Sequence, residues 1–200
     1  GYRQIDINLG CPFPMIAGKH KGAGMLLYPA QVAEVLAPIA EYPEIQFSLK
    51  MRLGWGNASE CMVLVELLNA IRLSRIALHA RTGKQQYKGH PDLEAFQGFY
   101  ELCQHPLYYN GGIESLSDIR QILIRFPLLK GVFIGRGLLS SPLLAKEFKG
   151  NETFLPEQRM SIYFAFHEEL FSAYSQVLQG ETQLLVKMKT LWEYFLPETD

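Results

Sequence analysis

A cysteine in an unusual setting is the first chemically suggestive residue of the chain. Cys11 lies between Gly10 and Pro12 in the stretch NLGCPFP, which directly follows the strand-like run Ile5–Leu9. A thiol acts as a general acid only when it is held within hydrogen-bond reach of the group that it protonates. Glycine permits close approach and proline stiffens the exit from the loop. The alternative role is that of a small buried hydrophobic residue, the commonest fate of a free cysteine and the one we expect for Cys61 and Cys103.

Further polar residues follow four later apolar runs. They are Lys50–Gly54, His79–Thr82, Asn110–Gly112 and Gly135–Gly137. If the runs are parallel strands, their carboxyl ends meet, and an ammonium group, an imidazole and two glycine-rich turns surround the thiol. Such turns can present backbone N–H groups to an anion such as phosphate, with an arginine as counter-charge. Ordinary tight-turn chemistry is the alternative for a single Asn-Gly turn, and two of them favour phosphate.

The elements that must position these residues alternate along the chain. The runs that read as strands are Ile5–Leu9, Ile45–Met51, Arg75–His79, Leu107–Tyr109 and Gly131–Ile134. A helical pattern or a helix-capping pair follows each one, such as Ser115 with Asp118, or Ser141-Pro142. This alternation predicts parallel strands covered by helices. Polar groups at every strand end favour a (β/α)₈ TIM barrel over a doubly wound sheet, which gathers its groups at a switch point.

We therefore predict an α/β fold in which residues 1–149 are part of a TIM barrel and residues 150–200 are part of an all-helical domain. Barrels often bind phosphate after strands 7 and 8, so the two glycine-rich turns make the first visible strand number 4. Barrel strands 1–3 are then expected to lie outside this chain, in agreement with its opening on Gly1. Apolar spacing in the tail predicts two amphipathic helices, through Met160, Tyr163, Phe164, His167, Leu170, Phe171 and Tyr174, and through Leu184, Leu185, Met188, Leu191, Trp192 and Phe195.

Composition limits the classes of function. The 200 residues are 48% hydrophobic, enough for a sizeable core, and no apolar run is long enough to span a membrane. Three cysteines suggest reduced thiols in the cytoplasm. A net charge of −1 means that any contact with nucleic acid must come from local basic patches. His20, His90, His105 and His167 lack metal-ligand spacing, so we predict no metal site.

An ordered series of motifs over residues 1–148 resembles the tRNA-dihydrouridine synthases. The motifs are NLGCP after a strand, GAGMLL (22–27), KMRLG (50–54), HART (79–82) with Tyr87-Lys88-Gly89, NGGI (110–113) and IGRG (134–137). The resemblance implies an FMN-dependent TIM barrel followed by a helical domain that helps to hold tRNA. It also implies reduction of a specific uridine to 5,6-dihydrouridine, with NADPH or NADH as the reductant and a full-length protein that is monomeric.

The resemblance assigns roles to individual residues. Cys11 is implied as the acid that protonates C5 of uracil, while reduced FMN delivers hydride to C6. Lys50 is implied at the flavin N1/O2 edge, where a cation stabilises developing negative charge, and His79 at the flavin or its phosphate. The phosphate cradle is expected from Asn110, Gly111, Gly112, Gly135 and Arg136. Two positions depart from the family, which often has aspartate in place of Gly112 and glycine in place of Ala80.

We expect RNA contacts from residues around the same opening. They are Asn8, Lys19, Lys21, Arg52, Arg81, Lys84 and Tyr87, with His20 and Lys88 nearby; Tyr87 is the one that could stack on a base. Each charge taken alone reads as a solvated surface residue. Two rival functions stay open: an FMN barrel that acts on a free pyrimidine, and a barrel that binds RNA without catalysis.

Overall fold

The computed structural model describes residues 1–195, whose five strands form one parallel sheet in chain order. The strands are β1 (Gln4–Leu9), β2 (Gln46–Gly54), β3 (Arg75–Thr82), β4 (Leu107–Asn110) and β5 (Gly131–Phe133). Each strand pairs with the next one along the chain and is followed by helical structure, which is the arrangement inside a (β/α)₈ barrel. The predicted fold class is confirmed.

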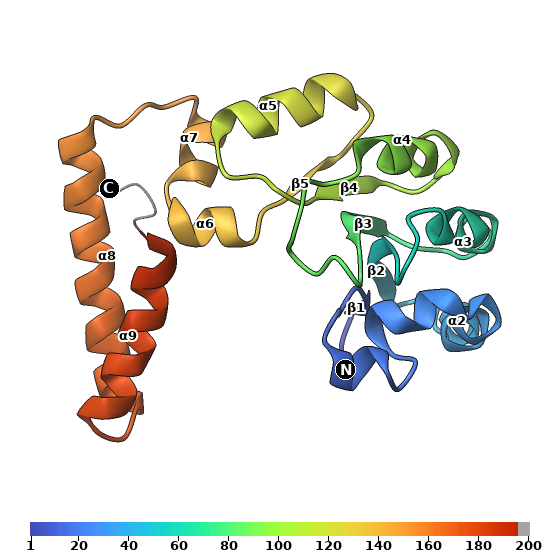
Figure 1. Cartoon of the computed structure of the whole chain (residues 1–200), viewed down its shortest axis with the longest axis horizontal. Helices are drawn as coiled ribbons and strands as arrows, with labels where there is room; N and C mark the ends of the chain where they lie inside the picture. Colours follow the sequence, from blue (N-terminus) through green and yellow to red (C-terminus); the bar gives the residue numbers. More distant parts are fainter. Residues whose placement is uncertain (196–200) are drawn as a thin grey trace. The chain divides into compact units, whose positions relative to one another are not determined.

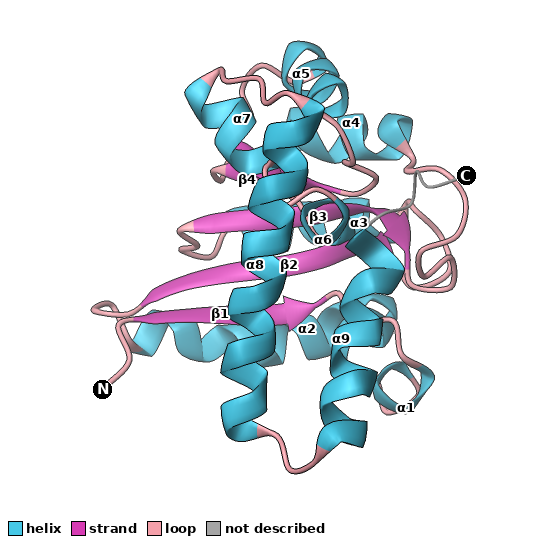
Figure 2. Cartoon of the chain, turned by 90° about the vertical axis from the view of Figure 1, so that its left-hand side faces the viewer, coloured by secondary structure: helices cyan, strands magenta, loops and turns pink. Residues whose placement is uncertain are grey.

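The helices between the strands cover one side of the sheet. They are α2 (Pro29–Leu36), α3 (Glu60–Asn69) and α4 (Leu93–Leu102). The short helix α1 (Pro14–Ala17) and the 3₁₀ segment η1 (Gly22–Leu27) belong to the connection after β1, and the 3₁₀ segment η2 (Ala37–Glu41) follows α2. Figure 1 shows α2, α3 and α4 on the same side of β1 to β3, and Figure 2 shows these strands side by side. Their inward faces are fully buried, as at Leu36, Leu64 and Phe96. The helices therefore supply the core of the sheet from one face.

The sheet has one apolar face and one polar face, because side chains alternate along a strand. Leu49, Met51 and Leu53 of β2 are fully buried on the helix side. On the opposite face, the register places Asp6 beside Ser48, Asn8 beside Lys50, and Arg52 beside His79. The polar residues of the candidate site therefore lie on the face of the sheet opposite to α2, α3 and α4.

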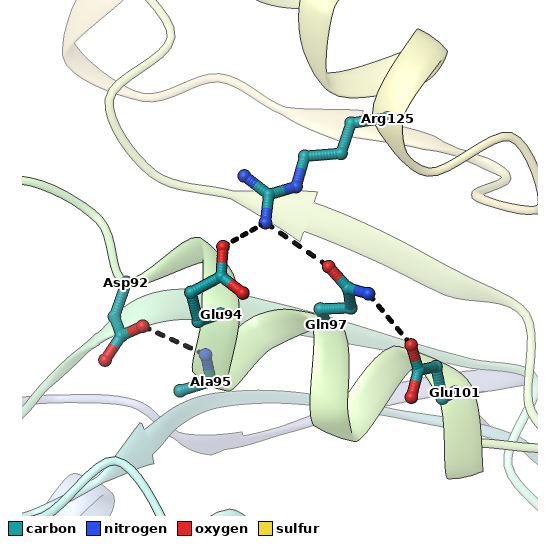
Figure 3. Close-up of polar contacts among 6 residues, drawn as sticks. All are labelled: Asp92, Glu94, Ala95, Gln97, Glu101 and Arg125. Carbon is teal, nitrogen blue, oxygen red and sulfur yellow. Dashed lines mark hydrogen bonds and ion pairs between the residues drawn. The ribbon is translucent and has the colours of Figure 1, made fainter.

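Helices α4 and α5 (Leu116–Arg125) are joined by a polar network on the surface, drawn in Figure 3. Arg125 Nη2 donates to Glu94 Oε1 at 2.5 Å and to Gln97 Oε1 at 3.3 Å. Gln97 in turn donates to Glu101 at 2.9 Å, and the Asp92 carboxylate caps α4 by accepting from Ala95 N at 2.9 Å. The network consists of exposed groups, so we expect it to add little stability.

The predicted helix caps have mixed outcomes. Ser115 and Asp118 form the expected reciprocal box, with Asp118 N donating to Ser115 Oγ and Ser115 N donating to Asp118 Oδ2. Ser141-Pro142 does not start a helix, which corrects the prediction. Helix α7 begins at Leu144, and the Ser141 hydroxyl lies 3.4 Å from the Tyr163 hydroxyl. The Ser141 hydroxyl therefore pairs with a side chain far along the chain, and only its carbonyl oxygen accepts from the first amide of α7, Leu144 N.

The tail contains α6 (Arg136–Ser140), α7 (Leu144–Gly150), α8 (Pro156–Val177) and α9 (Glu181–Phe195). Its small core is Leu143 and Tyr163, against which Phe154, Ile162, Phe166 and Leu191 pack. Both long helices were predicted. Met160, Phe164, Phe171 and Leu185 were expected on packed faces but are exposed, since this small core covers only part of each helix.

The described residues group into two compact units. One unit comprises residues 1–112 and 120–133, and the other comprises residues 113–119 and 134–195. The barrel part was expected to reach residue 149. A tRNA-binding helical domain over residues 150–200 stays a prediction, and its residues 196–200 lie outside the described part.

No helix in the described part is both long and apolar enough to cross a membrane.

A buried ion pair is expected to matter more than the exposed one. Glu147 of α7 is 2% exposed and is paired with Arg159 of α8. We expect Arg159→Met to lower the free energy of unfolding by about 2 to 3 kcal/mol, because it leaves a buried carboxylate unpaired. Urea unfolding monitored by circular dichroism gives the measurement. Arg125→Met, at the exposed pair with Glu94, is the matched control and should cost less than about 1 kcal/mol. Equal losses in the two variants would contradict the argument.

Candidate active site

The loop that carries Cys11 begins with a side-chain-to-backbone bond. Strand β1 ends at Leu9, and Asn8 Oδ1 accepts from Gly10 N at 2.8 Å. This local turn fixes the direction of the chain as it enters Cys11, which is half-buried. Asn8 was predicted as an RNA contact, and its side chain has a structural task here.

A glycine that the motif analysis did not single out packs directly against Cys11. Gly22 has φ +54, and a Cβ at this position would lie 2.7 Å from the Cys11 carbonyl oxygen and 2.9 Å from its Cβ. Ala23 N donates to the same carbonyl oxygen at 3.0 Å. Segment η1 therefore wraps around the cysteine, and glycine is required at 22 by both conformation and space. The glycines of GAGMLL were the signal available in the sequence.

Lys50 lies against the same loop. A Cβ on Gly10 would lie 3.6 Å from Lys50 Nζ and 3.6 Å from Asn8 Oδ1, so the three residues converge at the carboxyl end of β1. Burial lowers the pKa of Lys50, the nearby Arg52 lowers it further, and Asp6 opposes both. Asp6 itself accepts from Ser48 Oγ at 2.5 Å. The site thus brings a partly buried ammonium group next to the loop that carries the thiol.

His79 is held by Arg81 from the same strand. Arg81 Nη1 lies 3.3 Å from His79 Nε2, and Arg81 Nε and Nη2 donate to the Gly89 carbonyl oxygen at 3.2 and 2.9 Å. A guanidinium group can only donate hydrogen bonds, so His79 Nε2 is the acceptor in this contact. Arg81 thereby links the His79 ring to the Gly89 carbonyl oxygen.

The turn after β4 depends on two glycines. His79 is in register with Asn110. Gly111 has φ +134, and a Cβ there would lie 3.2 Å from His79 Cδ2; Gly112 has φ +59. Asn110 Nδ2 donates to the Phe133 carbonyl oxygen at 2.8 Å, which ties β4 to the end of β5. The predicted turn is therefore present next to the histidine, although the Asn110 side chain is engaged within the sheet.

The second predicted turn has a different local structure. Gly135 is the N-cap residue of α6, and Arg136 and Gly137 are its first helical residues, where a glycine-rich turn was expected. Gly137 is buried against the Ile113 carbonyl oxygen, at 2.1 Å from an added Cβ, which explains a glycine at this position. The role of Gly135 and Arg136 in binding phosphate stays a prediction.

The predicted RNA contacts fall into two groups. Lys19, Lys21, Lys84 and Lys88 are exposed, and Tyr87 is 49% exposed. Arg52 and Arg81 are 1% and 5% exposed, so the expectation that they are exposed rim charges is wrong. Their guanidinium groups donate to backbone carbonyl oxygens. His20 stacks on Tyr28, with ring centroids 4.2 Å apart.

The loops after β2 and β3 are joined by backbone bonds. Gly83 N donates to the Gly54 carbonyl oxygen and Lys84 N donates to that of Trp55, both at 2.8 Å. A Cβ on Gly83 would lie 2.3 Å from the Trp55 ring, which packs closely over the glycine.

Among residues 1–195, no three His, Cys, Asp or Glu side chains are close enough together to hold a metal ion.

Comparison with known proteins gives a consistent result. The dihydrouridine synthase (Dus) family matches residues 1–196. A probable tRNA-dihydrouridine synthase of Rhizobium leguminosarum bv. phaseoli is 32% identical over 139 residues, which is 69% of this chain and 44% of that protein. tRNA-dihydrouridine synthase B of Vibrio vulnificus (strain CMCP6) is 27% identical over 161 residues, 78% of this chain and 50% of that protein. The chain spans about half the length of the curated relatives it matches.

Gly22→Ala tests the packing around Cys11. We expect a loss of about 2 kcal/mol in the free energy of unfolding, since the new methyl group meets a main-chain oxygen and the backbone is left-handed. Thermal or urea unfolding measures the loss. Gly98→Ala within α4 is the control: its Cβ has an ordinary contact of 3.6 Å with Met62 Sδ, and it should be neutral or stabilising. A neutral Gly22→Ala would refute the described packing.

Lys50→Met tests the electrostatic cost of the buried ammonium group. The lowered pKa means that the folded state binds the Lys50 proton less tightly than the unfolded state does. This cost is fully present below the folded-state pKa and is relieved as pH rises toward the ordinary value of 10.5. We expect the variant to be more stable than the parent near pH 7, with a difference that shrinks as the pH rises toward 10.5. Urea midpoints at pH 7 and at pH 10.5 measure this change, and a pH-independent difference would contradict the prediction.

Proposed function

Because the chain belongs to the dihydrouridine synthase family, we propose that the protein reduces a specific uridine of tRNA to 5,6-dihydrouridine. One observation supports this activity most directly. The Cys11 loop, shaped by Asn8 and wrapped by Gly22, lies beside the Lys50 ammonium group at the carboxyl ends of the strands. The curated relatives are named tRNA-dihydrouridine synthases, which supports tRNA as the substrate.

The residues of the polar sheet face fit an aromatic cofactor that gains negative charge on reduction and carries a phosphate group. Lys50, Arg52 and Arg81 are cations on one face, and His79 lies beside the two-glycine turn at Gly111. We propose that Lys50 and His79 hold the ring of FMN, and that Asn110, Gly111, Gly112, Gly135 and Arg136 hold its phosphate. When bound and reduced by NADPH or NADH, FMN would supply the hydride for C6 of the uracil ring.

Cys11 completes the reduction in this proposal. Its neutral thiol transfers the proton from Sγ to C5 of the uracil, which requires the ring to lie within hydrogen-bond reach of the loop. The bonds to Gly10 N and to the Cys11 carbonyl oxygen hold the loop before substrate arrives, so little reorganisation is needed at the proton transfer.

The tRNA contacts are proposed for the exposed members of the predicted set. Lys19 and Lys21 follow the Cys11 loop, and Lys84 and Lys88 belong to the loop after β3. A uridine must leave the folded tRNA to reach the thiol, and Tyr87 is exposed enough to stack on a base during that step. A tRNA substrate would place the protein in the cytoplasm.

Replacing the proposed acid tests the function. In the full-length protein, we expect Cys11→Ala to lower dihydrouridine formation in tRNA at least about 100-fold, because a positioned general acid contributes about that much. Mass spectrometry of digested tRNA measures the product, and the visible flavin spectrum should be unchanged.

The matched control is Cys103→Ala, which removes a free thiol at the C-terminal end of α4 and should keep full activity. Undiminished product with Cys11→Ala would reject the proton-donor role. An absence of flavin absorbance in the parent would reject the whole proposal, and activity on free uridine without activity on tRNA would favour a small-molecule substrate.

A further inference from the structure

Arg52 is a buried cation that has no acidic partner in the described part of the chain. It is 1% exposed, and no carboxylate among residues 1–195 forms an ion pair with it. Burying a guanidinium group costs several kcal/mol unless its donors are satisfied. Packing alone could be achieved by an apolar side chain, so a charged group in this place needs a separate explanation.

The donors of Arg52 are satisfied by main-chain oxygens from two loops. Arg52 Nε donates to the Gly10 carbonyl oxygen at 3.0 Å. Its Nη1 donates to the carbonyl oxygens of Thr82 and Gln86, at 2.9 and 2.6 Å. A planar guanidinium holds these donors in one rigid fork, so the three oxygens are fixed relative to one another. One side chain on β2 thereby connects the loop after β1 to the loop after β3.

The two connected loops carry the residues that the proposed reaction uses. Gly10 is the residue immediately before Cys11. Gln86 has φ +52, a left-handed conformation that costs about 1 kcal/mol for a residue with a side chain and is retained here by its bond to Arg52. Tyr87 follows it; its ring lies 5.4 Å from the guanidinium carbon, and its side chain is hydrogen-bonded to Arg52. The arginine therefore acts on the neighbours of both Cys11 and Tyr87.

We propose that Arg52 is a positioning residue, which sets the location of the Cys11 thiol through its main-chain bonds and that of the Tyr87 ring through main-chain and side-chain contacts together. The consequence for catalysis rests on the proposed function, whereas the consequence for the loop does not. Tyr87 opposes the lowering of the Arg52 pKa that burial causes, which supports a charged guanidinium in this place.

The test compares Arg52→Lys and Arg52→Gln with the parent in the full-length protein. Lysine keeps the charge but has no planar fork, and glutamine keeps one donor without charge. The first readout is the rate at which iodoacetamide alkylates Cys11, followed by peptide mass spectrometry, which needs neither cofactor nor tRNA. We expect Arg52→Lys, which keeps the positive charge near the thiol, to react at least about fivefold faster, because the loop is released from the fork. Cys61 serves as a negative control, because burial raises its pKa to about 12 and keeps it unreactive.

The second readout is steady-state kinetics, which separates an effect on tRNA binding from an effect on turnover. We expect kcat for tRNA reduction to fall about 10- to 100-fold while KM for tRNA stays within about twofold, as expected when a group acts only in the chemical step. Arg75→Lys, at the exposed start of β3, is the matched control and should leave both readouts unchanged.

Each outcome decides the proposal. Alkylation and kcat within twofold of the parent would overturn it, and a large rise in KM with unchanged kcat would return Arg52 to RNA binding. If neither variant folds, the arginine supports the whole fold instead of one loop, and the proposal also fails. A parent without dihydrouridine activity would refute the proposed function alone, because the alkylation comparison would still test the loop.

Discussion

The in-register parallel pairing of β1 to β4 is the constraint on which the candidate site depends. Parallel pairing sets residues of neighbouring strands side by side, so Asn8 meets Lys50, Arg52 meets His79, and His79 meets Asn110. A slip of one residue would turn every one of these side chains toward the helices. The buried apolar residues on the other face prevent that slip, since Leu49, Met51 and Leu53 would then face the polar side.

Much of this arrangement could be predicted from local sequence. Apolar runs with polar residues directly after them identify strands and the edge where their ends meet, and the Ser115–Asp118 box was recognisable from spacing alone. The exact strand ends were not predictable. Strands β2 and β3 continue to Gly54 and Thr82, because Gly83 and Lys84 bond across to the loop after β2. Such pairing depends on two segments that are about 30 residues apart in the chain.

The burial of Arg52 and Arg81 illustrates what local patterns do not contain. In the sequence, an arginine that follows an apolar run resembles a surface charge. In the folded chain, the carbonyl oxygens that accept from these two guanidinium groups lie 30 and 34 residues away from Arg52 and 8 residues away from Arg81. Backbone acceptors occur at every position and leave no mark in the sequence. Gly22 is a similar case, because the close approach to Cys11 that requires it exists only in the folded chain.

The bonds from Arg52 to main-chain oxygens have a consequence for how such a protein can change over time. Oxygens of the peptide backbone are the same whatever side chains the neighbouring loops bear, so no replacement at positions 10, 82 or 86 can compensate for loss of the arginine. Pairs of side chains that touch tend to vary together, but a bond to a main-chain oxygen has no second side chain to vary. Covariation among related sequences would therefore overlook these three bonds and report at most the contact of Arg52 with the Tyr87 side chain.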